Sequence, residues 1–577
     1  MSFLTVPGRA RRAAACTAAL ALATACGENP VGPGAGGTGS NPSSAPSVGT
    51  LLRLNAYTDA ACDTVRTGFR GGRVVAVGDR AIVVADTLNP AGGFTTAEYA
   101  SFAASFDTLA YPVDVRNFGA PTDLDNNGRV IIFFTTAVNA LTPRRADFVV
   151  GGFFWNRDLF PKSSARPQDA CPGSNDGELF YMLAPDPAGT VNGNARTKDY
   201  VARSSVGVLA HEFQHLINAS RRLYVLNTDN FDEDVWLNEG LSHVAEELLF
   251  FRASGTAPRQ NIPLAALQSN NTARTAFNAY NVQNFARFSD YLAATEDNSP
   301  YAQDDSLDTR GATWAFLRYA ADRTVAAGAP SDSAFLYRLV NSTRTGLPNL
   351  QQALAGTGGA AVTLADWFRD WSVATYADEL VSGANARFTQ PSWEFRDVVA
   401  GINSNTYPLA TRALAEGQAQ TVTLNAGGAA YLRFTVPAGG QATVSVRSAG
   451  GAAPPAAVRA SLIAPNAITT YDAGTASVTA AAGSAATTYA LALFNADTAA
   501  GARTPVAVTA SGVTAAVAER APAQAGPTFA RLAAEALSEP PMTDAPLHAR
   551  LHALGRPALA GRVASARASY VARRAER

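Results

Sequence analysis

The feature that most constrains this chain is a pair of histidines four residues apart in an apolar, helix-like run, residues 206–217. Residues 211–215 read His-Glu-Phe-Gln-His, and the whole chain has only five histidines. Positions i and i+4 lie on one face of a helix, so His211 and His215 can reach the same ion. Glu212 between them is placed to act on a metal-bound water. We therefore expect a metal-binding helix over this run.

A second block downstream offers a third ligand. Residues 236–242 read Trp-Leu-Asn-Glu-Gly-Leu-Ser and open another helical run that continues to Phe250. Glu239 then stands on the first turn of that helix and can face the helix of the histidine pair. Two imidazoles, one carboxylate and a fourth position open to water form the thermolysin-like arrangement of a catalytic zinc ion.

The metzincin arrangement, by contrast, is excluded. That pattern needs Gly and His three and six residues after the second histidine, and these positions hold Asn218 and Arg221. It also needs a downstream methionine turn, whereas the methionines stand only at positions 1, 182 and 542.

Together the two blocks resemble the gluzincin zinc peptidases, and most closely the hyicolysin-like secreted bacterial group. Looser similarities lie in residues 178–181, 314–319 and 370–374. The resemblance covers about residues 51–400. It implies an α+β fold of the thermolysin-like two-lobe metallopeptidase type, with a β-rich N-lobe, helices that carry the zinc site and a helical C-lobe.

The resemblance also implies a role for each site residue. His211, His215 and Glu239 are ligands of one catalytic Zn²⁺ ion, and Glu212 is the general base that takes a proton from the zinc-activated water. In thermolysin-like enzymes an Asp four residues after the ligand Glu orients an imidazole, but here that position holds His243. His243 could orient an imidazole, act as an alternative ligand or lie exposed on the helix.

Other polar residues have less defined roles. Glu246 and Glu247 are expected as helix-surface carboxylates, although Glu246 could orient an imidazole. The oxyanion formed during peptide hydrolysis needs a further stabilising donor, usually Tyr or His. Tyr301, Tyr319 and His243 are the candidates, and the sequence does not choose among them.

These residues predict an exported zinc-dependent endopeptidase that hydrolyses proteins or peptides. A zinc aminopeptidase shares the Trp-Leu-Asn-Glu-Gly block but should carry Gly-x-Met-Glu-Asn upstream, where the only methionine is Met182, between Tyr181 and Leu183. A non-catalytic cell-surface protein that retains a zinc site is a third hypothesis, but such a site has no need of Glu212. The net charge of −1, from 46 basic and 47 acidic side chains, gives no indication of nucleic-acid binding.

The N-terminus is typical of an export signal. Basic residues precede a short apolar run at 13–25, which ends in Ala-Thr-Ala and is too short to span a bilayer. We expect residues 1–25 to be a signal peptide and residues 26–50, rich in Gly, Pro and Ser, to be a tether. Cys26 after the cleavage site resembles the bacterial lipoprotein pattern, with Ala23 where Leu is usual. The chain is thus expected as a cell-surface lipoprotein anchored to the membrane at Cys26, or as a freely secreted protein.

Two cysteines remain in the body of the mature chain, Cys62 and Cys171. In an oxidising compartment we expect them to form a disulfide, the alternative being two free buried thiols.

An acidic stretch, residues 123–128, could bind calcium. Asp123, Asp125 and Asn127 present oxygens at alternate positions before a glycine, as at the start of a Ca²⁺ loop. Phe134 replaces the closing Glu of an EF-hand, so the alternatives are a different structural Ca²⁺ site and an Asx-rich turn.

The rest of the chain divides by its residue pattern. We expect a zinc metallopeptidase domain over residues 51–400, a small β-sandwich domain over 412–515 and an Ala/Arg-rich, partly disordered tail with solvated charges over 516–577. The local signals are a hairpin of strands 73–77 and 81–85, a helix-capping box from Thr95 to Glu98, strands at 130–135, 148–155 and 179–183, and a cap for the histidine helix at Ser204 or Ser205.

Overall fold

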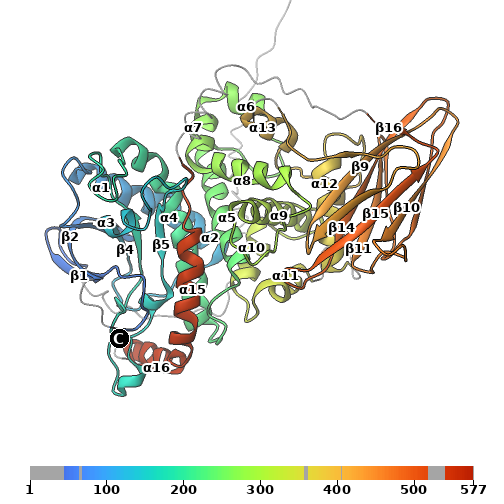
Figure 1. The fold of residues 1–577 in the computed structure, drawn as a ribbon. Coiled ribbons are helices and arrows are strands. Elements are labelled where there is room, and N and C mark those ends of the chain that lie inside the picture. The colour runs from blue at the N-terminus through green and yellow to red at the C-terminus, as the bar shows by residue number, and fades with distance from the viewer. Residues whose placement is uncertain (1–44, 64–67, 356–361, 404–405, 517–539, 576–577) are drawn as a thin grey trace, which may run out of the picture. The chain divides into compact units, whose positions relative to one another are not determined.

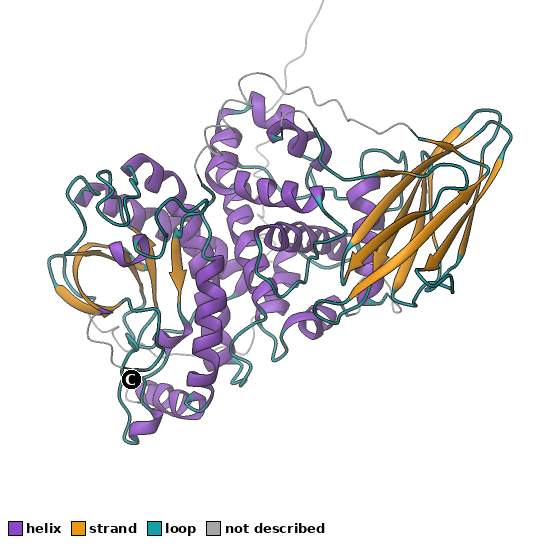
Figure 2. Ribbon diagram, viewed as in Figure 1, coloured by secondary structure: helices purple, strands orange, loops and turns teal. Residues whose placement is uncertain are grey.

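The computed structural model describes residues 45–63, 68–355, 362–403, 406–516 and 540–575, which belong to one structural unit (Figure 1). Helices and strands both contribute to it, in agreement with the α+β expectation (Figure 2). The predicted signal peptide, Cys26 and most of the tether lie outside the described residues. In the described part of the chain, no helix combines the length and the apolar character needed to cross a membrane.

A mixed sheet forms the N-terminal part of the fold, with the strand order β1-β2-β3-β4-β6-β5. β4 pairs in parallel with β3 and β6, and the other neighbours are antiparallel. β5 is an edge strand, which leaves backbone groups on its outer side for another partner. The strands are β1 (Leu51–Asn55), β2 (Phe69–Val77), β3 (Ala81–Asp86), β4 (Val130–Thr135), β5 (Gly152–Phe154) and β6 (Leu179–Leu183).

Most local signals in this part are confirmed. β2 and β3 form the predicted hairpin, and β4 and β6 have the predicted bounds. Thr95 and Glu98 form the predicted capping box, with each side chain bonded to the backbone N–H of the other. The strand expected over 148–155 is shorter, since only β5 is regular. The helices here are α1 (Thr96–Ser105), a π-helical turn (Phe106–Ala110), α2 (Tyr111–Phe118) and α3 (Thr136–Asn139).

Two long helices, α4 (Lys198–Ser220) and α5 (Val235–Ser254), carry the histidine and glutamate blocks and pack against each other. The predicted cap of α4 at Ser204 or Ser205 is wrong, because the helix begins earlier, where the Thr197 side chain caps it. Both serine hydroxyls instead donate to carbonyls in the preceding turn of α4. Serine inside a helix commonly bonds in this way.

A helical region follows α5. α9 packs against both α5 and α8. α5 and α9 approach closely at Gly240, where an added Cβ would lie 2.3 Å from Thr313 Cγ2. The helices are α6 (Leu264–Ser269), α7 (Asn271–Tyr280), α8 (Val282–Ala293), α9 (Leu307–Ala326), α10 (Asp332–Val340), α11 (Gly346–Leu354), α12 (Leu364–Ala377) and α13 (Phe395–Ile402).

Two sheets, antiparallel apart from the parallel pair of β7 with β9, lie within the segment expected to be a β-sandwich. Their strand orders are β13-β10-β15-β8 and β12-β11-β14-β9-β16, with β7 added beside β9. Alternating residues of both sheets, including Leu432, Val444, Leu491 and Val506, are buried in a shared apolar core. The strands are β7 (Arg412–Ala413), β8 (Gln420–Asn425), β9 (Ala429–Val436), β10 (Gln441–Ser448), β11 (Val458–Ala464), β12 (Ala467–Thr470), β13 (Ser477–Ala481), β14 (Thr487–Asn495), β15 (Arg503–Ser511) and β16 (Thr514–Ala515).

Two helices, α15 (Ala545–Ala560) and α16 (Val563–Ala575), form the described end of the chain. Their arginines are not simply solvated, as the sequence had suggested. Arg567 pairs with Asp229 at 3.0 Å, and Arg573 pairs with Asp176 at 2.8 Å. This end of the chain is therefore joined to loops of the preceding region.

The predicted disulfide between Cys62 and Cys171 is confirmed, with their Cα atoms 4.3 Å apart. It links the segment after β1 to the loop before β6.

Candidate metal centre

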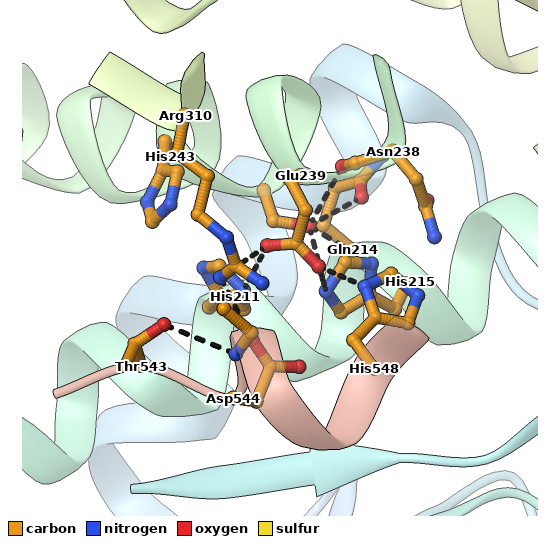
Figure 3. A network of polar contacts seen from close by, with 12 residues as sticks. His211, Gln214, His215, Asn238, Glu239, His243, Arg310, Thr543, Asp544 and His548 are labelled. Atoms are coloured by element: carbon orange, nitrogen blue, oxygen red, sulfur yellow. Dashed lines mark hydrogen bonds and ion pairs between the residues drawn. The ribbon is translucent and has the colours of Figure 1, made fainter. Parts of the chain in front are cut away.

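α4 and α5 bring the predicted ligand residues together in the interior of the protein (Figure 3). His211 Nε2 lies 3.4 Å from Glu239 Oε2, and His215 Nε2 lies 3.5 Å from Glu239 Oε1. The three side chains are at most 7% exposed. Ligands about 2.0–2.1 Å from a tetrahedral zinc ion lie roughly 3.3–3.4 Å from one another. The spacing and chemistry of these groups therefore suit a zinc ion.

Glu212 lies on the same helix and borders the same space. Its side chain is buried, and its Oε2 atom has no hydrogen-bond partner among the described residues. Glu212 also lines a cavity of about 70 Å³ together with His211 and Gly152. A buried acceptor without a partner is costly, so this atom is suited to receive a hydrogen bond from a bound molecule such as water.

β5 approaches α4 closely beside Glu212. A Cβ added at Gly152 would lie 2.8 Å from both the Tyr181 carbonyl oxygen and Val208 Cγ1, and 3.3 Å from Glu212 Cγ. Only glycine therefore fits between β6 and α4 at this point, and it sets an edge strand directly against the candidate centre.

Side chains on α5 hold both imidazoles in orientation. Glu246 accepts hydrogen bonds from His211 Nδ1 at 3.0 Å and from His243 Nδ1 at 3.1 Å, while Ser242 Oγ lies 3.1 Å from His215 Nδ1. A carboxylate on Nδ1–H leaves Nε2 of His211 free to bind a metal. Glu246 thus has the orienting contact that the sequence left as an alternative.

The surface position expected for Glu246 and Glu247 is wrong for both. Glu246 lies between two buried histidines, and the Glu247 side chain is fully buried. Glu247 faces Arg318 at 3.4 Å and accepts a hydrogen bond from Trp393 Nε1 at 2.8 Å. Both side chains lie on the face of α5 that packs into the protein.

The neighbouring protein groups shift the pKa values of His211, His215 and Glu212. Burial lowers the pKa of His211, but the hydrogen bonds and charges of Glu239 and Glu246 outweigh it and raise that pKa well above the usual value. Burial lowers the pKa of His215 to about 3. Burial, with Asp544 as the next cause, raises the pKa of Glu212 well above its usual value. A divalent ion at the centre would therefore replace the proton of His211, as metal ions generally do at their ligands.

Sequence reasoning missed a buried arginine on α9. Arg310 Nη1 lies 2.6 Å from Glu239 Oε2, and its guanidinium also contacts Asp305 and Asp544 at 2.8 Å each. Arg310 is 71 residues from Glu239 in the chain, and only the packing of α9 on α5 brings it to the centre.

Two residues from the C-terminal end were also missed. Asp544 is close enough to share one metal ion with His211, His215 and Glu239, because one donor atom of each lies within 4.8 Å of the others. His548 Nδ1 contacts Glu239 Oε1. Figure 3 shows both side chains pointing toward the histidine pair from the start of α15. Their positions in the sequence, more than 300 residues away, carried no signal of this contact.

The structure does not place the two tyrosine candidates for the oxyanion at the centre, whereas the third candidate, His243, lines the same cavity as His211 and Glu212. The Tyr301 hydroxyl donates to the Asp497 carbonyl at 2.8 Å, and the Tyr319 hydroxyl donates to the Arg387 carbonyl at 2.6 Å. His243 is buried and bonded to Glu246, so it is not exposed on the helix.

The acidic stretch forms a turn stabilised by hydrogen bonds from its own backbone and side chains. Asn127 N donates to Asp123 Oδ1 at 3.0 Å, and Asn127 Nδ2 donates to Asp125 Oδ2 at 2.6 Å. Glu178 is close enough to share an ion with Asp123 and Asp125. Calcium binding by Asp123, Asp125 and Asn127 stays a prediction.

Two imidazoles, a carboxylate and a buried glutamate on packed helices define a candidate zinc centre, and comparisons with known proteins agree in part. No family model matches the chain. It is 30% identical over 143 residues to the "Neutral metalloprotease ShpI" of Staphylococcus hyicus. That match spans 25% of this chain and only 29% of the relative.

Among the solved structures that match, that of the periplasmic g-type lysozyme inhibitor PliG of Aeromonas hydrophila aligns over 18% of this chain and all of its own. The sequence identity is 14% and the TM-score is 0.14, too low to indicate a shared fold.

Proposed function

We propose that this protein is an exported zinc-dependent endopeptidase that hydrolyses peptide bonds of proteins or peptides. The proposal rests on one observation, the approach of His211 Nε2 and His215 Nε2 to the Glu239 carboxylate at 3.4 and 3.5 Å beside the buried side chain of Glu212. The partial similarity to a neutral metalloprotease supports it.

In this proposal, His211, His215 and Glu239 hold the ion. A zinc ion bound there supplies Lewis acidity and a water of lowered pKa. Glu212 Oε2 takes the proton of the attacking water and later passes it to the leaving amine. Glu246 and Ser242 keep the two imidazoles in orientation through their Nδ1 atoms.

The arrangement around this centre further supports a thermolysin-like two-lobe peptidase. The sheet that ends in β5 lies on one side of α4, and α5 with the helices that follow lies on the other. The lobes would hold an extended substrate between them, with β5 as the edge that pairs with it. Export by the predicted signal peptide, with or without a lipid anchor at Cys26, belongs to the same proposal.

Zinc analysis of the purified full chain tests the ligand set without depending on turnover. We expect about one zinc per chain, and less in the His211→Ala, His215→Ala and Glu239→Ala variants. Equal zinc content in all four proteins would contradict the proposed ligands. A matched control is His552→Ala, because His552 pairs with Asp232 and belongs to none of the described groups suited to a metal.

Hydrolysis of casein, with and without a chelator, tests the reaction. Asp544 lies among the proposed ligands and His548 contacts Glu239, so both could obstruct a substrate. Casein is therefore offered both to the intact chain and to a chain cut after folding. The cut is made by a site-specific protease at a recognition sequence inserted between Ala516 and Pro540. We expect zinc-dependent internal cleavage, whereas release of N-terminal residues alone would favour an aminopeptidase. A zinc-loaded protein inactive in both forms would favour a non-catalytic protein.

A further inference from the structure

The C-terminal segment, residues 540–575, reaches the candidate centre from the far end of the chain. We propose that it is an internal inhibitor, in which the Asp544 carboxylate is a fourth protein ligand of the metal ion and takes the place of the attacking water. This inference rests on the proposed function, since it requires a catalytic metal at His211, His215 and Glu239.

The segment enters by pairing with the sheet edge beside the centre. Val149, three residues before β5, forms a parallel bridge with Met542. Val149 N donates to the Pro541 carbonyl at 3.0 Å, and Thr543 N donates to the Val149 carbonyl at 2.8 Å. Free edge backbone commonly binds an extended peptide in this way. The segment therefore pairs with the backbone just before β5, the edge that the proposed function assigns to a peptide substrate.

Asp544 directs its carboxylate to the centre although it stands where it could cap a helix. It is the N-cap residue of α15, yet its side chain makes no capping hydrogen bond. Asp at this position usually accepts a bond from the first-turn backbone. Here the carboxylate instead contacts Arg310 at 2.8 Å and lies among His211, His215 and Glu239. The Asp544 carboxylate therefore interacts with the candidate centre instead of capping the helix that follows it.

The group that the segment presents cannot be hydrolysed. A substrate offers a backbone amide to the metal, whereas the segment offers a side-chain carboxylate with no bond to cleave. Carboxylate oxygen is also an ordinary ligand of zinc. Such a ligand fills the fourth position that a catalytic zinc site must keep open.

His548, in the first turn of α15, fixes the segment to the proposed ligand Glu239. His548 contacts Glu239, and its ring lies 5.0 Å from that of His215, centroid to centroid. Leu547 and Leu551, each 3% exposed, form the apolar side of the helix and are buried against the rest of the protein. The contact with the centre is thus part of a packed interface.

Charge complementarity joins the rest of the segment to the protein. Arg550 pairs with Asp59 at 2.9 Å and His552 with Asp232 at 3.1 Å, in addition to the arginine pairs of α16. Arginine side chains of the segment thus meet acidic side chains of the earlier part of the chain. Exposed ion pairs of this kind weaken with salt. Release of the segment is therefore expected to become easier at high ionic strength.

The test measures access to the metal rather than turnover alone. Zinc-loaded full-length protein and its Asp544→Ala variant are titrated with a peptide hydroxamate, whose two oxygens bind zinc at an open position. We expect both proteins to hold about one zinc, and the variant to bind the hydroxamate at least tenfold more tightly and to cleave casein faster. Arg556→Ala, an exposed change on the same helix, is the control and should behave as wild type.

The second measurement uses the chain cut between Ala516 and Pro540. This protein folds with the C-terminal segment in place, and the segment can be released only after the cut. After the cut and transfer to high salt, its hydroxamate affinity should rise toward that of Asp544→Ala. If wild type, Asp544→Ala and cut protein all bind zinc and hydroxamate equally, the inhibitor inference is wrong while the proposed function stands. If none binds zinc or hydroxamate, the proposed function fails and the inference fails with it.

Discussion

Glu246 offers a sharp test of how the candidate centre is built. Its carboxylate accepts hydrogen bonds from His211 and His243 at 3.0 and 3.1 Å, in a side chain that is only 13% exposed. In Glu246→Gln one acceptor oxygen becomes an amide donor, so one of the two bonds is lost and the charge is removed. A hydrogen bond to a charged group contributes about 1.5–3 kcal/mol. Loss of a carboxylate behind a ligand histidine typically costs 10–100-fold in metal affinity, about 1.4–2.7 kcal/mol.

The assay is competition for zinc against a chromophoric chelator at neutral pH. We expect the zinc dissociation constant of Glu246→Gln to rise at least tenfold, with little change in the melting temperature of the zinc-loaded form. Glu98→Gln is the control, because Glu98 pairs with Lys198, the first residue of α4 and more than three turns before His211, and should leave zinc affinity unchanged. A zinc affinity of Glu246→Gln within twofold of wild type would refute the orienting role.

Three further predictions follow from the same geometry. Glu212→Gln should keep its zinc but lose about 10²- to 10⁴-fold of the casein hydrolysis seen with the cut chain, and full activity of this variant would rule out Glu212 as the general base. Replacing Cys62 and Cys171 by serine opens a loop of 109 residues, which should lower the free energy of unfolding by about 5 kcal/mol on the chain-entropy model. Denaturant titration measures this change, and an unchanged unfolding midpoint would show that the disulfide does not constrain the unfolded chain. Removing zinc with a chelator should lower the melting temperature, and restoring zinc should recover it, because an ion that binds only the folded state stabilises it.

The sequence predicted the parts of this protein that depend on local pattern. The i, i+4 spacing of His211 and His215 and the separate block around Glu239 were sufficient to place three donors on two helices that meet. The capping box at Thr95 and strands β4 and β6 were likewise predictable, because short-range hydrogen bonding and apolar runs determine them.

The rest of the site depends on contacts between distant segments. Glu246 was expected at the surface, because the polar and apolar pattern of α5 alone does not show that other elements pack against several of its faces. Arg310 reaches Glu239 only through the packing of α9 on α5, and Asp544 reaches it through α15. No local pattern around Arg310 or Asp544 carries that information, so tertiary packing alone identifies them.

Anomalous diffraction at the zinc edge, from crystals of the zinc-loaded protein, locates the ion and so tests whether His211, His215 and Glu239 bind it. We expect one strong peak about 2.0–2.2 Å from His211 Nε2, His215 Nε2 and a carboxylate oxygen of Glu239. A peak at another described group suited to a metal would contradict this expectation, whether that group is His211 with His243 and Glu246 or Glu239 with Asp305 and His548. So would the absence of any peak near His211 and His215 in zinc-loaded crystals.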